Sequence, residues 1–198
     1  MTEKKPSRRT LSFIQKYPTP AELYEKVTTS EGWEYKTNED FYHTRDRALV
    51  SMLYVLVLRV SEALRLVNSQ NEREKTKITV NSIKLSKSYK KTKARRHQYR
   101  EEGWIALTGE RAGFGKLITE YLDLLEPNAQ LFPFGRKRAY QIVEAITGEP
   151  PHWLRAYGEK YLYRKWNRDP IAVSDYVKVD LNVLMFYIRE SYQDYKAV

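Results

Sequence analysis

Residues 45–67 read RDRALVSMLYVLVLRVSEALRLV, and apolar side chains occupy nearly every face when this segment is drawn as a helix. A surface helix would show a polar stripe, so the pattern predicts one long buried helix, or two short ones, in a core. Within it, LRVSE at 58–62 places Arg59 and Glu62 among leucine and valine. An unpaired buried charge is costly. Arg59 therefore needs either Glu62, one helical turn away, as a structural partner or an anionic ligand such as a phosphate.

Cap and proline signals predict further helices on both sides of this segment. Thr19 and Pro20 are typical of a helix start, with a hydroxyl N-cap and a proline at the first helical position. Proline also interrupts helices, which places a break at Asp169-Pro170. Helices are therefore expected over about 20–28, 113–125 and 135–148, and in two or three pieces from His152 to the C-terminus.

One region has the alternation of strands instead. Residues 77–85 (KITVNSIKL) alternate and contain β-branched side chains, and residues 104–107 (WIAL) are apolar again. Between them, residues 87–100 (KSYKKTKARRHQYR) are intensely basic, which predicts a β-hairpin with a long basic tip. We therefore expect an α+β fold class, a mainly α-helical single domain with a small antiparallel β-sheet, over residues 19–198.

The composition narrows the class of function. Lysine and arginine outnumber aspartate and glutamate by 35 to 25, a formal net charge of +10, which favours nucleic acid as a partner over the alternative of a generally basic protein. The basic arm at 1–18 is expected either to be disordered or to reach phosphates. With no cysteine and only three histidines, no disulfide, thiol nucleophile or metal centre is expected. No run of about 18 apolar residues and no signal peptide is present, so we expect an intracellular, cytoplasmic protein without membrane contact.

A second candidate site is HWLR at 152–155, which follows two prolines at the start of a predicted helix. A spacing of three residues puts His152 and Arg155 on one face of that helix, beside free backbone amides that favour an anion. The run therefore predicts a phosphate-binding geometry. Taken alone, H-x-x-R also occurs by chance, so its weight comes from its combination with Arg59.

In chain order, LRVSE, the basic hairpin, HWLR and Tyr187 near the C-terminus resemble the catalytic domain of the tyrosine recombinase and integrase family. The family's first-arginine motif reads G-L-R-x-S-E, and here Val57 stands in place of the glycine. The family carries a histidine or tryptophan 23 residues after the second arginine and the nucleophilic tyrosine nine residues later. These positions are Lys178 and Tyr187, so the spacing matches while Lys178 departs from the usual residue. A further departure is Ala156, where many members have a second histidine.

The resemblance implies a site-specific DNA recombinase or integrase that needs no cofactor. Tyr187 would attack the scissile phosphate and form a 3′-phosphotyrosyl intermediate. Arg59 and Arg155 would neutralise the phosphate, and His152 would hydrogen-bond it or accept the tyrosine proton. Lys178 would contact a non-bridging oxygen. Replacing either arginine with alanine is expected to abolish cleavage and to leave the fold intact.

The resemblance also assigns a lysine of the hairpin to protonate the leaving 5′-oxygen. Lys91 is preferred, because Lys91-Thr92 resembles the family's Lys-Thr signature. The remainder of the basic segment predicts phosphate contacts with salt-dependent affinity, and a solvated charged loop is the alternative. Close alternatives to Lys91 are Lys87, Lys90 and Lys93.

The expected partner is double-stranded DNA, with self-association into a tetramer on DNA and a monomer as the alternative in its absence. The N-terminal core-binding domain that family members commonly carry is expected to be absent. Two other functions stay open: a catalytically inactive recombinase-fold DNA-binding protein and a type IB topoisomerase-like enzyme. Tyr192 and Tyr195 are alternative nucleophiles, and packing of the Tyr187 ring in a terminal helix is the alternative to catalysis. The target site and the biological role stay open as well.

Overall fold

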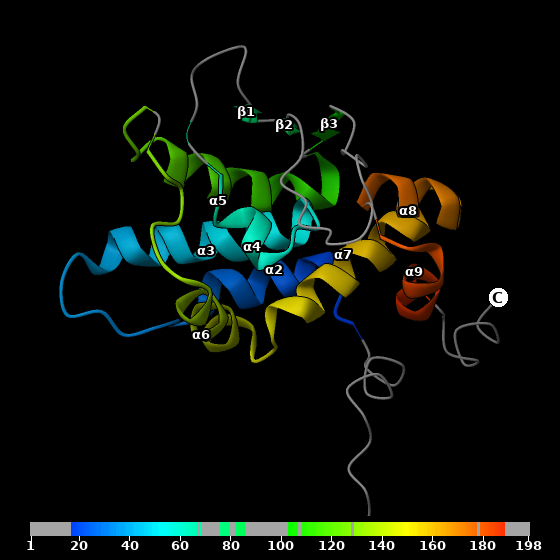
Figure 1. Ribbon diagram of the computed structural model, residues 1–198. Helices are drawn as coiled ribbons and strands as arrows, with labels where there is room; N and C mark the ends of the chain where they lie inside the picture. Colours follow the sequence, from blue (N-terminus) through cyan, green and yellow to red (C-terminus); the bar gives the residue numbers. More distant parts are fainter. Residues whose placement is uncertain are drawn as a thin grey trace, which may run out of the picture.

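The computed structural model describes residues 17–66, 68, 76–79, 82–85, 103–106, 108–127, 129–177 and 179–188, with the backbone alone in the three strand segments. Among the helices described, none is both long and apolar enough to cross a membrane. The elements, shown in Figure 1, are α2 (Pro20–Thr29), α3 (Glu39–Val55), α4 (Val60–Ala63), β1 (Thr76–Thr79), β2 (Ser82–Leu85), β3 (Gly103–Ala106), the 3-10 helix η1 (Gly109–Arg111), α5 (Ala112–Leu122), α6 (Arg136–Thr147), α7 (Pro151–Lys165), α8 (Pro170–Val177) and α9 (Leu181–Ile188).

Helix α3 is the centre of the fold. It packs against α2, α5, α6 and α7, and Figure 1 shows it running between α5 and the layer that contains α2 and α7. Its residues from Ala48 to Val55 are all fully buried or nearly so. The prediction of a buried helical core over this segment is confirmed, in its two-helix form, because α3 ends at Val55 and α4 begins at Val60.

Local signals account for several of the helix ends. The Thr19 hydroxyl accepts a hydrogen bond from the backbone N–H of Glu22, and the Glu22 carboxylate accepts one from the N–H of Thr19. The carboxylate of Asp169 accepts hydrogen bonds from the N–H groups of Ile171 and Ala172, which starts α8 at the expected break. Both caps satisfy amide groups that have no partner within the helix.

The expected α+β fold class is wrong. Of the residues whose side chains the structure describes, 67% are helical and none lies in a strand. The backbones of three four-residue segments pair antiparallel in the order β1-β2-β3, but the described core consists of side chains from the helices and the turns that connect them. The alternation of residues 77–85 indicates local extended backbone, whereas the class of a fold depends on which elements fill its core. The basic segment 87–100 lies outside the described residues.

The buried apolar side chains form two clusters. The larger is built on α3 and takes side chains from α2, α5, α6 and the start of α7. The smaller, called here the C-terminal cluster, ties α8 and α9 to the second half of α7. These two helices pack on α7 and on each other. The C-terminal cluster consists of Val57, Leu162, Val173, Val177, Leu184 and Ile188.

Candidate active site

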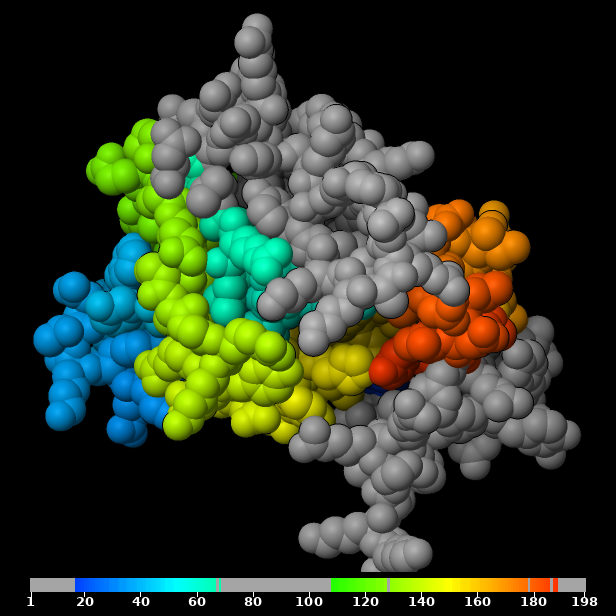
Figure 2. Space-filling model, in the orientation of Figure 1, coloured from blue at the N-terminus to red at the C-terminus, as the bar shows by residue number. Residues whose placement is uncertain are grey.

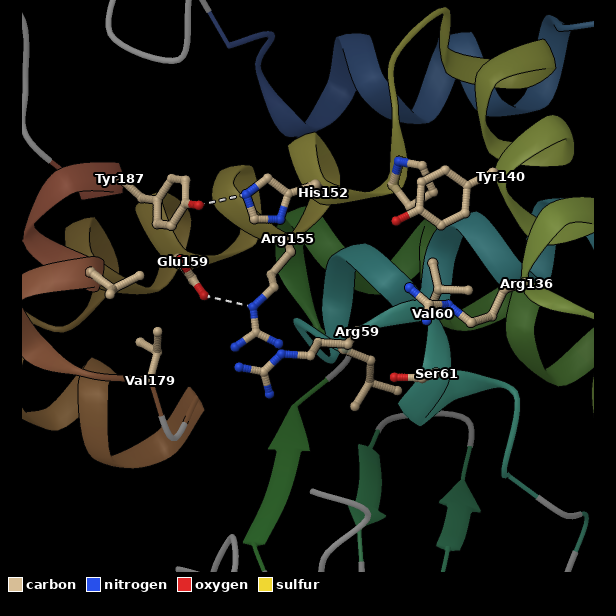
Figure 3. Close-up of a pocket in the computed structure, with 13 residues that line it drawn as sticks. Arg59, Val60, Ser61, Arg136, Tyr140, His152, Arg155, Glu159, Val179 and Tyr187 are labelled. Atoms are coloured by element: carbon tan, nitrogen blue, oxygen red, sulfur yellow. Dashed lines mark hydrogen bonds and ion pairs between the residues drawn. The ribbon is translucent and has the colours of Figure 1, made fainter. Parts of the chain in front are cut away.

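A surface pocket of about 210 Å³ opens where α7, α9, the start of α6 and the α3–α4 turn meet. Drug-sized ligands occupy pockets of roughly 300–1,000 Å³, so this pocket suits one small group. Helices α6, α7 and α9 are seen on one face of the molecule in Figure 2. The polar side chains that line the pocket, several labelled in Figure 3, are Arg59, Ser61, Arg136, Tyr140, His152, Arg155, Glu159 and Tyr187.

Four of the six predicted site residues therefore lie around one pocket. Arg59, His152, Arg155 and Tyr187 come from three separate parts of the chain, and the fold brings them together. The other two, Lys91 and Lys178, lie outside the described residues.

Arg59 lies in the turn between α3 and α4. Its backbone N–H donates to Oε2 of Glu62 at 2.7 Å, and its Nη1 donates to Oε1 at 2.9 Å. The structural pair predicted from the sequence is therefore present. The Arg59 side chain is still 38% exposed, and a guanidinium has five N–H donors. Arg59 can consequently keep its bond to Glu62 and present other donors to an anion in the pocket.

Arg155 is held more tightly than Arg59. Its side chain is 6% exposed, its Nε donates to Oε1 of Glu159 at 2.9 Å, and its Nη1 lies 3.6 Å from Oε2 of Glu62. Both carboxylates are buried. Glu62 thus contacts both arginines. The side chains of Arg59 and Arg155 lie beside each other in Figure 3. The orientation of Arg155 is fixed before any ligand binds.

His152 and Tyr187, which line the same pocket as the two arginines, are in direct contact with each other. Nε2 of His152, in the first turn of α7, lies 2.6 Å from the Tyr187 hydroxyl oxygen, and the two rings meet edge to face. Partial burial, and then the positive charges of Arg155 and Arg59, lower the pKa of His152 below its usual 6.5. The imidazole is therefore neutral at pH 7, and a neutral ring can accept a proton from a neighbouring hydroxyl.

The shift of His152 gives the first prediction, which involves no assumption about function. In a titration followed by NMR, we expect a midpoint below 6.5 for His152 and a higher midpoint in Arg59→Ala, because a nearby positive charge is removed. The protein has three histidines, and a His152→Gln variant identifies the resonance. A midpoint at the ordinary value, unmoved by Arg59→Ala, would contradict this description of the pocket.

Four polar residues of the pocket were not predicted as site residues: Ser61, Arg136, Tyr140 and Glu159. Arg136 and Tyr140 lie one turn apart on α6 and, in Figure 3, across the pocket from Tyr187. Basic residues at 136–138 form the first turn of α6, where acidic side chains are normally favoured, and this was the available signal. Glu159 stands four residues after Arg155 on α7, and that spacing alone puts the two on one helix face.

Among the described residues, no cluster of three histidine, aspartate or glutamate side chains is arranged to hold a metal ion. The pocket described above instead gathers guanidinium groups, an imidazole and a phenol. Cations with forked N–H donors suit a phosphate or another oxyanion. The arrangement is therefore able to bind an anion beside a tyrosine hydroxyl.

The sequence matches no protein-family model and no curated protein. Solved structures similar in fold include XerH site-specific recombinase bound to palindromic difH substrate in a post-cleavage complex, at 19% identity and a TM-score of 0.63, over 90% of this chain and 50% of that one. A pre-cleavage complex of XerH with difH matches at 20% identity and 0.61, over 92% and 53% of the two chains. XerA recombinase matches at 16% and 0.56, over 98% and 64%.

The chain thus spans about half the length of the XerH chains that it matches. At these identities the similarity establishes the fold, which is of the tyrosine recombinase type.

Proposed function

We propose that this chain is a site-specific recombinase that cleaves and rejoins DNA strands through a covalent link to Tyr187. The observation that carries the proposal is the 2.6 Å contact between the Tyr187 hydroxyl and Nε2 of His152, in a pocket that Arg59 and Arg155 also line. A nucleophile, a proton acceptor and two cations at one small pocket suit attack on a phosphodiester. The recombinase-type fold supports the same class of protein.

In the proposed step, Tyr187 Oη attacks phosphorus and its proton passes to Nε2 of His152. The bond from phosphorus to the 5′-oxygen breaks, and that oxygen leaves as a hydroxyl after it receives a proton. A 3′-phosphotyrosyl link remains, and attack on it by a 5′-hydroxyl reverses the step and rejoins a strand. One phosphodiester replaces another, so no external energy source is required. We assign the proton for the 5′-oxygen to Lys91, and a contact with a non-bridging oxygen to Lys178.

The arginines make this step easier in two ways. An unperturbed tyrosine has a pKa of about 10, and nearby positive charge favours the phenolate over the phenol. The same charge stabilises the extra negative charge of the pentacoordinate transition state. Because two carboxylates already orient Arg155, little reorganisation is needed when the phosphate arrives.

We further assign double-stranded DNA as the partner and a tetramer on DNA as the working assembly. The net charge of +10 supports binding to a polyanion. Apolar side chains on α9 are exposed next to the nucleophile, where a second copy of the chain would cover them. These are Leu181, Val183 and Met185, at 40%, 45% and 42% exposure.

A DNA-binding protein without catalysis is the second candidate, and one observation favours it. Glu159 lines the pocket, and its negative charge opposes the positive charge that a phosphate needs. In the active enzyme we assign Glu159 to the orientation of Arg155. The covalent test below separates the two functions.

The test is covalent trapping on nicked duplexes with randomised sequence around the nick, resolved on a denaturing gel. We expect a protein–DNA adduct from the unaltered protein and none from Tyr187→Phe, because phenylalanine has no nucleophile. Tyr140→Phe is the matched control, since Tyr140 lines the same pocket, and it should still form the adduct. An adduct that survives in Tyr187→Phe contradicts the proposal. DNA binding without any adduct from the unaltered protein supports the non-catalytic candidate.

A further inference from the structure

Val57 has a backbone conformation that its side chain disfavours. Its φ is 53°, in the left-handed region that a β-branched residue rarely adopts, because its side chain crowds the backbone there at a cost in free energy. Glycine adopts this region without that cost. Val57 is also fully buried. A strained residue of this kind persists only where the surrounding structure requires it.

The contacts of the Val57 side chain indicate what requires it. Val57 belongs to the C-terminal cluster, whose other members lie on α7, α8 and α9. It comes instead from the turn after α3, two residues before Arg59. Among the described residues of the cluster, Val57 is therefore the member that lies in the turn between α3 and α4, which also contains Arg59. Leu184 and Ile188 of the same cluster lie on α9, on either side of Tyr187 in sequence.

Helix α7 carries a glycine where Val57 approaches it. A Cβ added to Gly158 would lie 2.9 Å from Cγ2 of Val57 and 2.7 Å from the Tyr54 carbonyl oxygen. Both distances are too short for a real side chain, so Gly158 leaves the space that Val57 and the end of α3 occupy. Gly158 is three residues after Arg155. The turn that contains Arg59, helix α7 with Arg155 and helix α9 with Tyr187 thus all contribute to the cluster around Val57.

We propose that Val57 is a positioning residue that sets the placement of Tyr187 relative to Arg59. Its side chain ties the turn that presents Arg59 to the helices that present Tyr187, and the backbone strain is the cost of keeping a branched side chain there. The catalytic consequence rests on the function proposed above. The structural link does not, and it is tested separately.

The test compares Val57→Gly, Val57→Ala and Val57→Thr with the unaltered protein. Hydrogen exchange in residues 181–188 reports the structural link, and adduct formation on nicked DNA reports the chemistry. In Val57→Gly we expect faster exchange in this segment and adduct formation slower by about 10- to 100-fold, since small misplacements of reacting groups have effects of this size. DNA affinity is expected to stay unchanged. Val57→Thr keeps the branched shape and should retain most of the rate, while its buried hydroxyl lowers stability; Val57→Ala is expected to have a rate between those of the other two variants.

Val50→Ala is the matched control, because Val50 is a fully buried valine of the larger cluster. It should lower stability without changing either readout. If Val57→Gly does not fold, Val57→Ala carries the test. Unchanged exchange at 181–188 together with an unchanged adduct rate overturns the proposal, as does an equal slowing by Val50→Ala. If exchange at 181–188 is faster in Val57→Gly but neither the unaltered protein nor any variant forms an adduct, the structural link is supported and the proposed enzymatic function is contradicted.

Discussion

Arg59→Ala is expected to slow adduct formation by about 10²- to 10³-fold, the usual effect of removing one donor to a transition-state oxyanion. Stability should change little, because the Arg59 side chain is 38% exposed. The backbone N–H at this position can still donate to Glu62 in the variant. Rates on nicked DNA and a thermal melt measure the two effects.

Arg65→Ala is the control for this variant, since Arg65 is an exposed arginine of the same segment. It should leave both the rate and the melting temperature unchanged. Adduct formation at the normal rate by Arg59→Ala would remove Arg59 from the proposed chemistry.

Arg155→Ala is expected to abolish adduct formation and also to destabilise the protein by about 3–5 kcal/mol, the typical effect of breaking a buried ion pair. Glu159, at 1% exposure, would lose its ion pair with Arg155, and Glu62, at 6%, would keep Arg59 alone of its two arginines. For a chain of this size such a loss lowers Tm by roughly 6–20 °C. The sequence alone led us to expect an intact fold for both arginine variants, and burial is what separates them. Thermal unfolding followed by circular dichroism measures the difference.

Adding Glu159→Gln to Arg155→Ala provides the control, because it neutralises the buried carboxylate that has lost its ion pair with Arg155. The double variant should recover part of the lost stability without recovering activity. An Arg155→Ala variant as stable as the unaltered protein would contradict the buried network described here.

Helix ends were predictable where a single residue decides them. Thr19 with Pro20, and Asp169 with Pro170, act through bonds to their immediate neighbours, so sequence is sufficient. The buried helix was predictable because nearly every face of residues 45–67 is apolar. The fold class was not, because alternation in 77–85 indicates extended backbone and says nothing about which side chains fill the core.

Some residues of the site were likewise predictable from the sequence and others were not. Arg59, His152, Arg155 and Tyr187 were found through motif spacing, since those spacings reflect one arrangement around a pocket. Arg136 and Tyr140 were missed, because only the tertiary placement of α6 brings them there. The strained backbone of Val57 could not be predicted either, because a sequence does not specify backbone angles. The only available sign was that valine stands where the family motif has glycine. The catalytic roles of the four residues found through motif spacing, like those of Lys91 and Lys178, stay predictions.

The account rests most directly on Tyr187 as the residue that becomes attached to DNA. The adduct can be treated with nuclease and trypsin, and the peptide that retains a nucleotide identified by mass spectrometry. Cleavage after Lys178 and Arg189 gives VDLNVLMFYIR, whose single tyrosine is Tyr187. The account predicts the nucleotide on this peptide. A nucleotide on ESYQDYK, which contains Tyr192 and Tyr195, or on the peptide that contains Tyr140, would contradict it.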